Sequence, residues 1–195
     1  NLCVTTQQDA KERLNWSVWQ RKVEAIIARV VTSQNQIIST KSALPTYIIN
    51  RKVRTDRREH ISNEFKDKPE FWVNWIEACE HTNGAVGLWN SIRKIVQEAK
   101  QQEYELILIC EDDHFFTEHY TPEYLFSNIF QAKQQGALLL NGGIGGFGTA
   151  LPVSPNRYWV DWFWCTQFII IYQPLFDDIL AVSYTHLTLP TICSV

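Results

Sequence analysis

The sequence contains no methionine, no recognisable signal peptide and no apolar run long enough to cross a bilayer. It also lacks a strong charge excess, because its formal net charge is only −3. That balance gives no electrostatic reason to expect binding to nucleic acid or to an anionic membrane. What remains is an ordinary globular composition, with 45% hydrophobic and 20% charged residues, over a length that suits one domain.

The cysteines are few and are not arranged as metal ligands. The chain has five of them, with no CxxC pair and no metal-ligand spacing. Cys79 and Cys110 fall in or next to predicted strands, where a free thiol behaves as a small apolar residue. This usage favours a reducing compartment.

Neither end of the chain has the features of a natural terminus. There is no methionine to serve as an initiator. The last stretch, Val182–Val195, resembles the translated read-through of a sequencing adapter. A genuine β-rich segment is the alternative for this stretch. We therefore expect a domain that is cut off before its end, followed by a non-native tail over residues 182–195.

The rest of the chain divides into two parts. Residues 1–44 are expected to form an amphipathic helix and a linker, as the remnant of an upstream domain. Within Asp9–Val31 apolar residues recur every three or four positions, which predicts a helix with one packing face. A membrane-surface helix is the less favoured alternative, because the basic excess there is small. From residue 45 to 181, strand and helix patterns alternate, which predicts an α/β fold with a mostly parallel sheet flanked by helices.

The expected elements of this second part follow from hydrophobic pattern and helix-end signals. Thr121 is a suitable N-cap, and Pro122 suits the first position of a helix that stops at Gly136. Pro174 is expected to open a last helix. The other expected elements are strands over 46–50, 71–78, 104–110, 137–141 and 167–172, and helices over 56–66 and 85–102.

The most informative segment is Leu106–His114, where an apolar strand ends on three consecutive carboxylates, Glu111, Asp112 and Asp113. Burying several negative charges together is costly unless a cation or hydrogen-bond donors compensate them. The carboxyl end of a strand in an α/β sheet is also where such sheets bind ligands. A hard divalent cation shared with a substrate phosphate is the expected partner. The alternative is an acidic turn that caps the next element.

Several arginines follow the first predicted strand. Arg51 and Arg54 fall in the strand-to-helix loop, from which side chains reach a phosphate or a base. Arginine suits bidentate phosphate contact, but a solvated role for this pair is left open. Arg57 and Arg58 fall inside the following helix, where a solvated face is the favoured interpretation.

Two further patterns remain open in function. Gly143–Gly148 fits GxGxxG, but prolines soon after it forbid the helix that a dinucleotide site requires. A flexible loop near a ligand is therefore expected there. Tyr158–Trp164 alternates like one strand with aromatic residues on both faces, and it suits either a platform for sugar rings or core packing. His81 and His114 are expected to be satisfied by local hydrogen bonds.

Three blocks of the sequence, in order, resemble glycosyltransferase family 25, the bacterial lipooligosaccharide galactosyltransferase type with a GT-A fold. They are the strand with its arginine-rich turn (Tyr47–Arg58), the segment with two glycines and a serine (Gly84–Ser91), and the strand ending in Glu-Asp-Asp (Leu106–Asp113). The resemblance covers residues 46–181. Leu88 and Ile92 depart from the family pattern, which has Cys and His at these positions.

The resemblance implies a partial GT-A-like glycosyltransferase domain over 45–181. It implies metal-dependent, inverting transfer of a sugar from a nucleotide-diphosphate sugar to a glycan or glycolipid acceptor, in the cytoplasm or in peripheral contact with a membrane. The implied metal is Mn²⁺ or Mg²⁺ on Asp113 and Glu111. The implied donor contacts are Arg51, Arg54, Gly84, Gly87, Ser91, Glu111 and Asp112.

The general base of this reaction is not identified, and Asp161 is a candidate only. The resemblance places the base beyond residue 181, so the chain as given is expected to be inactive. Two alternatives stay open. One is a non-catalytic glycan- or nucleotide-binding relative with the same sheet, and the other is a metal-dependent phosphoesterase that uses the same carboxylates.

Overall fold

The computed structural model describes residues 43–182 and the short strand 191–194. The chain divides into two units, residues 1–41 and 42–195, and all the described residues belong to the second. The helix predicted over 9–31 and nearly all of the linker that follows it lie outside the described residues. None of the helices in the described part has the length and hydropathy of a membrane-spanning segment.

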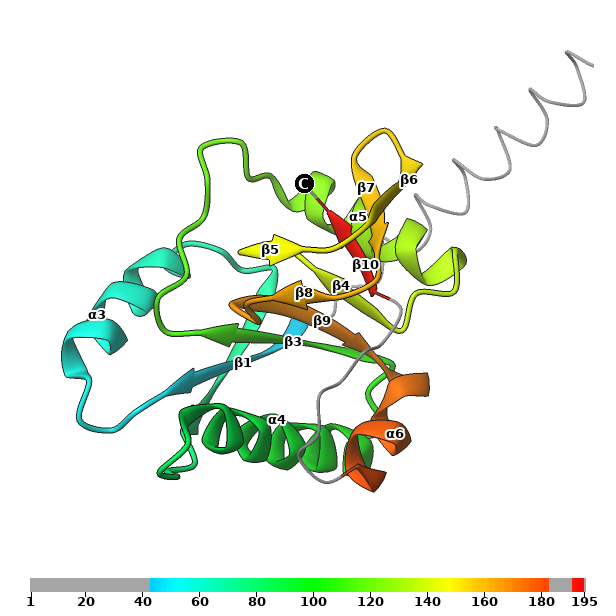
Figure 1. Ribbon diagram of the computed structural model, residues 1–195. Helices are drawn as coiled ribbons and strands as arrows, with labels where there is room; N and C mark the ends of the chain where they lie inside the picture. The colour runs from blue at the N-terminus through cyan, green and yellow to red at the C-terminus, as the bar shows by residue number, and fades with distance from the viewer. Residues whose placement is uncertain (1–42, 183–190, 195) are drawn as a thin grey trace, which may run out of the picture. The chain divides into compact units, whose positions relative to one another are not determined.

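An eight-stranded sheet forms the centre of this unit, in the order β2-β1-β3-β9-β4-β10-β7-β6 (Figure 1). Its strands are β1 (Leu44–Asn50), β2 (Phe71–Glu77), β3 (Leu106–Glu111), β4 (Leu139–Asn141), β6 (Ala150–Ser154), β7 (Arg157–Val160), β9 (Phe168–Tyr172) and β10 (Thr191–Ser194). Six of the eight strands run in one direction, and β9 and β7 run against them. The predicted α/β class with a mostly parallel sheet is confirmed.

Helices cover both faces of the sheet (Figure 1). They are α3 (Thr55–Glu64), α4 (Gly84–Gln101), α5 (Pro122–Gln134) and α6 (Phe176–Ala181). The side chains of β3 alternate between the faces, as a strand requires. Ile107 and Ile109 pack with α4 and α6, whereas Leu108 and Cys110 pack with α3 and α5. All four are at most 1% exposed, so β3 is buried on both faces as its sequence predicts.

The ends of α5 follow the predicted signals. The hydroxyl of Thr121 accepts a hydrogen bond from the backbone N–H of Tyr124 at 3.1 Å, and Pro122 is the first helical residue. Just past the helix, Gly136 has a φ of 78°, a left-handed conformation that suits glycine. Both predicted boundaries of this helix are therefore correct to within two residues.

The aromatic segment Tyr158–Trp164 is not one strand, and that prediction was wrong. β7 ends at Val160, and the chain then enters a separate two-stranded sheet of β5 (Gly146–Phe147) and β8 (Phe163–Trp164). The carboxylate of Asp161 accepts hydrogen bonds from the backbone N–H groups of Thr149 at 2.9 Å and Trp162 at 2.8 Å. These bonds hold the turn between the sheets, which the residue alternation does not reveal.

Two segments near the end of the chain concern the predicted last helix and the expected tail. Pro174 lies in a 3₁₀ turn, Gln173–Leu175, that precedes α6, so the α-helix begins two residues later than predicted. Residues 191–194, within the stretch expected to be a non-native tail, form β10, which pairs with β4 and β7.

Candidate functional site

Polar side chains gather where β1, β2 and β3 end. The strand register places Asn50 beside Glu77 and Ile49 beside Glu111, so the carboxyl ends of three parallel strands meet at one edge of the sheet. The loops that leave this edge carry the predicted arginines and carboxylates. This is the edge at which α/β sheets bind ligands.

Asp112 ties the end of β3 to the end of β1. It is only 8% exposed. Its Oδ2 accepts a hydrogen bond from Nδ2 of Asn50 at 2.7 Å, and the same amide lies 3.2 Å from the carbonyl oxygen of Arg54. Its Oδ1 accepts from Arg57 at 2.9 Å. Both carboxylate oxygens are therefore bound within the protein, and this predicted donor contact holds two strand ends together.

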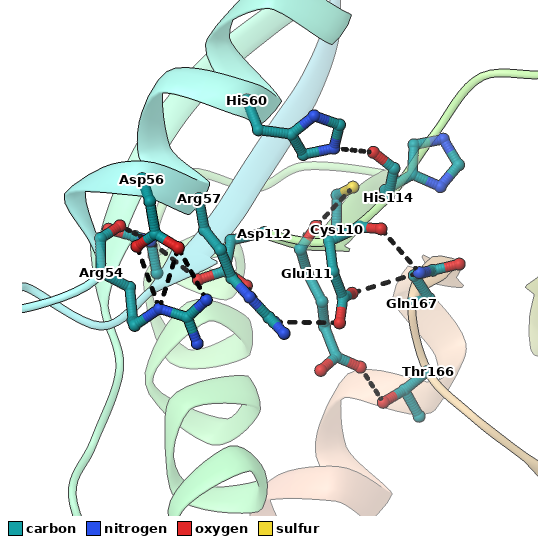
Figure 2. A network of polar contacts seen from close by, with 12 residues as sticks. Arg54, Asp56, Arg57, His60, Cys110, Glu111, Asp112, His114, Thr166 and Gln167 are labelled. Atoms are coloured by element: carbon teal, nitrogen blue, oxygen red, sulfur yellow. Dashed lines mark hydrogen bonds and ion pairs between the residues drawn. The ribbon is translucent and has the colours of Figure 1, made fainter.

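Arg57 is the cation of this cluster. Its Nη1 donates to Oδ1 of Asp112 at 2.9 Å and to Oδ2 of Asp113 at 3.0 Å, and Figure 2 shows it reaching from α3 toward the end of β3. The hydrogen bond to Asp112 raises the pKa of the Arg57 guanidinium. The expectation of a solvated face was wrong for Arg57, because the first turn of α3 lies beside the end of β3. Arg58 instead stacks over the ring of Trp75 at 4.2 Å.

Glu111 and Asp113 are held from the other side by the segment that precedes β9 (Figure 2). The hydroxyl of Thr166 donates to Oε1 of Glu111 at 2.8 Å, and Nε2 of Gln167 donates to Oδ1 of Asp113 at 3.1 Å. The side chain of Asp113 is 45% exposed. Burial raises the pKa of Glu111, and the charges of Asp113 and Asp112 add to the rise, while the bond from Thr166 opposes it. The cluster therefore holds more negative charge than its own contacts compensate.

The residues fit a divalent cation that is shared with a ligand. Three carboxylates and one guanidinium give the cluster a formal charge of −3 + 1 = −2. Among the described residues, no three His, Cys, Asp or Glu side chains are grouped to hold a metal ion by themselves. Mg²⁺ is commonly bound by one or two carboxylates together with substrate phosphates and water. Asp113 and Glu111 match that pattern once a phosphate ligand is present.

The two loop arginines lie at the same edge, each beside an acidic neighbour. Nη2 of Arg51 is 3.2 Å from Glu80, and Nη2 of Arg54 is 2.8 Å from Asp56. The hydrogen bond from Arg54 lowers the pKa of Asp56 to about 2. Exposed pairs of this kind contribute little stability. Replacing either carboxylate partner with a phosphate would therefore lose little stability.

α4 is connected to this edge through the loop after β2, because Ala78 donates to the carbonyl of Asn50 at 3.0 Å and the N–H of Cys79 donates to Ser91 of α4 at 2.8 Å. Asn83 caps the helix through a hydrogen bond from the N–H of Ala85 to its Oδ1 at 3.0 Å. Gly84 is the exposed first residue of the helix. The N-terminal end of an 18-residue helix favours a nearby anion.

Gly87 and Ser91, the other predicted donor contacts on α4, face inward. Ser91 is fully buried, its hydroxyl donates to the carbonyl of Gly87 at 2.9 Å, and it accepts from the N–H of Cys79 at 2.8 Å. A Cβ on Gly87 would lie 2.5 Å from the carbonyl oxygen of Cys79. Gly87 and Ser91 therefore hold the loop after β2 against α4, and this contact positions the start of the helix.

Replacing Gly87 with alanine is expected to destabilise the protein by about 1–2 kcal/mol, the usual cost of overpacking. The added methyl group meets backbone, which moves only if the loop or the helix shifts. The matched control is Gly84→Ala, because a Cβ on Gly84 meets nothing within 4 Å. Thermal unfolding should show a fall in melting temperature of several degrees for Gly87→Ala. The control should change the free energy of unfolding by less than about 0.5 kcal/mol. Equal melting temperatures would contradict the close contact with Cys79.

The histidines near the site divide into two kinds. His81 is satisfied locally, since its Nδ1 accepts from the N–H of Asn83 at 3.0 Å, as predicted. For His114 that prediction was wrong, because its buried Nε2 has no hydrogen-bond partner among the described residues. Its ring stacks on Phe168 at 4.7 Å, and burial lowers the pKa of His114 to about 4. The carbonyl oxygen of His114 lies 2.9 Å from Nε2 of His60.

Asp161, the candidate base, lies in the turn between β7 and β8. The hydrogen bond from the backbone N–H of Thr149 lowers the pKa of Asp161, and the N–H of Trp162 adds to this effect. A general base works best with a pKa near the operating pH. The arrangement therefore suits a permanently ionised hydrogen-bond acceptor better than a proton-transfer group.

No family model matches this chain, and no curated protein matches it. Similar solved structures include an apo UDP-glucose pyrophosphorylase, with a TM-score of 0.44, 9% identity, and coverage of 77% of this chain and 72% of that chain. A glycosyltransferase involved in glycosylation of the major capsid of PBCV-1 has a TM-score of 0.45 and 10% identity, and covers 71% of this chain and 64% of that one. A nucleoside-diphosphate-sugar pyrophosphorylase from Vibrio cholerae RC9 has a TM-score of 0.35 and 13% identity, with 85% and 69% covered. At these values the similarity assigns neither a family nor an activity.

Proposed function

We propose that this chain binds a nucleotide-diphosphate sugar at the carboxyl ends of β1, β2 and β3. We further propose that it belongs to an inverting glycosyltransferase that uses Mn²⁺ or Mg²⁺ and a glycan or glycolipid acceptor. The observation that carries this proposal is the cluster Glu111–Asp113, in which one internal cation, Arg57, bonds two of three neighbouring carboxylates at a ligand-binding edge of the sheet. The three sequence blocks that resemble glycosyltransferase family 25 support the same function.

Each residue of the cluster would have its own role in binding the donor. Asp113 and Glu111 would hold the metal ion, with Gln167 and Thr166 fixing their side chains. When bound, the ion supplies Lewis-acid stabilisation of the charge that develops on the leaving diphosphate. Asp112, bonded to Asn50, keeps the ends of β3 and β1 at a fixed separation.

Two features around the cluster would receive the rest of the donor. Arg51 and Arg54, at the end of β1, would exchange their exposed carboxylate partners for the nucleotide end, where arginine binds phosphate oxygens in pairs. The start of α4 would lie near the donor sugar and its phosphates.

Isothermal titration calorimetry of the chain with UDP and with GDP tests this proposal. We expect binding in the presence of Mn²⁺ or Mg²⁺ and none in excess EDTA, because Asp113 and Glu111 would otherwise repel the diphosphate. Binding that is equally tight in EDTA would contradict the metal-dependent function.

The two alternatives have distinct outcomes. Nucleotide binding without sugar transfer by a longer protein that also supplies the base expected beyond residue 181, in an assay with donor and acceptor, would indicate a non-catalytic relative. Metal-dependent hydrolysis of p-nitrophenyl phosphate would indicate a phosphoesterase. That reaction usually needs more His and Asp ligands than the described residues bring together.

A further inference from the structure

Two large aromatic side chains, Trp162 and Trp164, are exposed together at the small sheet of β5 and β8. Trp164 is 65% exposed and Trp162 41%, whereas Phe147, at 49%, pairs with Phe163 and so points to the other side of the small sheet. The two indole rings meet edge to face, with centroids 6.2 Å apart and planes at 84°. Leaving two aromatic rings in water forgoes the gain from burying them, and contiguous exposed apolar groups mark binding sites.

Glycine at position 148 makes room for the ring of Trp162, whereas a Cβ at position 146 would be in ordinary contact with Trp164. A Cβ on Gly146 would lie 3.5 Å from Cδ1 of Trp164, and a Cβ on Gly148 would lie 2.3 Å from Nε1 of Trp162. Residues two positions apart on an extended chain point to the same side. Both indoles therefore lie over one side of the glycine segment. Within the GxGxxG pattern, Gly148 leaves room for the ring of Trp162, and no helix follows the pattern as a dinucleotide site would require.

A short stretch of chain connects the exposed tryptophans to the carboxylate cluster. After Trp164 come Cys165, whose carbonyl oxygen accepts from the buried Asn141 at 3.0 Å, and then Thr166, whose hydroxyl donates to Glu111 at 2.8 Å. Two residues of chain span at most about 7 Å. The backbone of Trp164 therefore lies within roughly 7 Å of the residue that contacts Glu111.

We propose that Trp162 and Trp164 form a platform that binds a sugar ring of the glycan acceptor, with Asp161 accepting hydrogen bonds from its hydroxyl groups. This inference rests on the proposed function and adds the acceptor subsite to it. One face of a pyranose ring carries C–H groups, and their partial positive charge suits the negative face of an indole ring. A carboxylate beside the rings suits the hydroxyl groups at the rim of the same sugar.

The charges around the platform favour a neutral sugar over an anionic lipid surface. Between residues 143 and 166 the sequence has one basic residue, Arg157. That residue is 1% exposed and is bonded to Asn128 and Gln131 of α5, so it is not available to a headgroup. Surfaces that bind anionic lipids present clusters of exposed Lys and Arg. The charge next to Trp162 is instead the carboxylate of Asp161.

Saturation-transfer difference NMR on the full chain with methyl β-D-galactopyranoside and methyl β-D-glucopyranoside tests the platform. We expect saturation to reach the protons of one face of the pyranose ring. Trp164→Ala and Trp162→Ala should each weaken binding about tenfold, the usual effect of removing one stacked aromatic ring. Trp164→Phe keeps a ring and should retain most of the signal.

Trp72→Ala is the matched control, because Trp72 is 53% exposed on β2, at the opposite edge of the sheet from β6. It should leave the signal unchanged. The platform is overturned if the native chain gives no saturation transfer, or if all three alanine variants give the native signal. It is also overturned if Trp164 is needed for binding to phosphatidylglycerol vesicles and not for binding to the glycosides.

Calorimetry separates this inference from the proposed function. Trp164→Ala should bind UDP with Mn²⁺ as the native chain does, because Trp164 contacts neither Glu111 nor Asp113 through a hydrogen bond. If UDP binds but the glycosides do not, the platform fails and the proposed function stands. If the glycosides bind through Trp164 but UDP does not, the platform stands as a glycan-binding surface and the transferase proposal fails.

Discussion

Asp113→Asn is expected to weaken Mn²⁺-dependent binding of UDP by more than about 100-fold, since even residues that only support a metal ligand contribute 10–100-fold. The side chain of Asp113 is 45% exposed, so it can reach a metal ion at the surface of the cluster. The amide keeps the size of the side chain and removes its charge. The loss should therefore be seen in nucleotide affinity by calorimetry and leave the melting temperature close to native.

The control for this substitution is Asp178→Asn on α6. Asp178 is exposed and lies outside the cluster, so the same change of charge should leave UDP affinity unaltered. If Asp113→Asn binds UDP as tightly as the native chain, the assignment of Asp113 as a metal ligand is refuted. An equal loss in both variants would point to a general charge effect instead.

The fold class was predictable because its main signals are local. The run Leu106–Cys110 is apolar throughout, which marks a strand covered on both faces, and Thr121 with Pro122 marks a helix start. What local pattern could not predict is the pairing of β9 between β3 and β4, which runs against both. That choice depends on contacts between residues about 60 positions apart for β3 and about 30 for β4, and the period of the hydrophobic pattern carries no information on strand direction.

Part of the candidate site could likewise be predicted from the sequence, and part of it could not. A run of three carboxylates after an apolar strand could be recognised from the sequence. Asn50, Arg57, Thr166 and Gln167, which bond those carboxylates, could not, because each contact joins residues 54 to 62 positions apart. For Arg57 the helical position was predicted correctly. The face of the helix that meets the end of β3 depends on how α3 packs against the sheet, which the sequence of the helix alone does not define.

Arg57 competes with any cation for the cluster, and this competition can be measured. Its Nη1 bonds both Asp112 and Asp113, so Arg57→Gln leaves three neighbouring carboxylates without their internal cation. Breaking a fully buried pair costs roughly 3–5 kcal/mol. Because Arg57 is 38% exposed, we expect a smaller loss, about 2 kcal/mol. In a domain of this size that corresponds to a fall in melting temperature of roughly 4–8 °C in EDTA.

Added Mn²⁺ should then raise the melting temperature of Arg57→Gln more than that of the native chain. A ligand stabilises the folded state in proportion to the logarithm of its concentration over its dissociation constant. Without the guanidinium the site carries one more negative charge and no longer has to release Asp113 from Arg57. Arg58→Gln is the matched control, one residue along the same helix, because Arg58 stacks on Trp75 and has no bond to the cluster. A Mn²⁺-induced shift in Arg57→Gln no larger than the native shift would show that the carboxylates do not hold the cation, and a native melting temperature in EDTA would show that Arg57 is not their counter-ion.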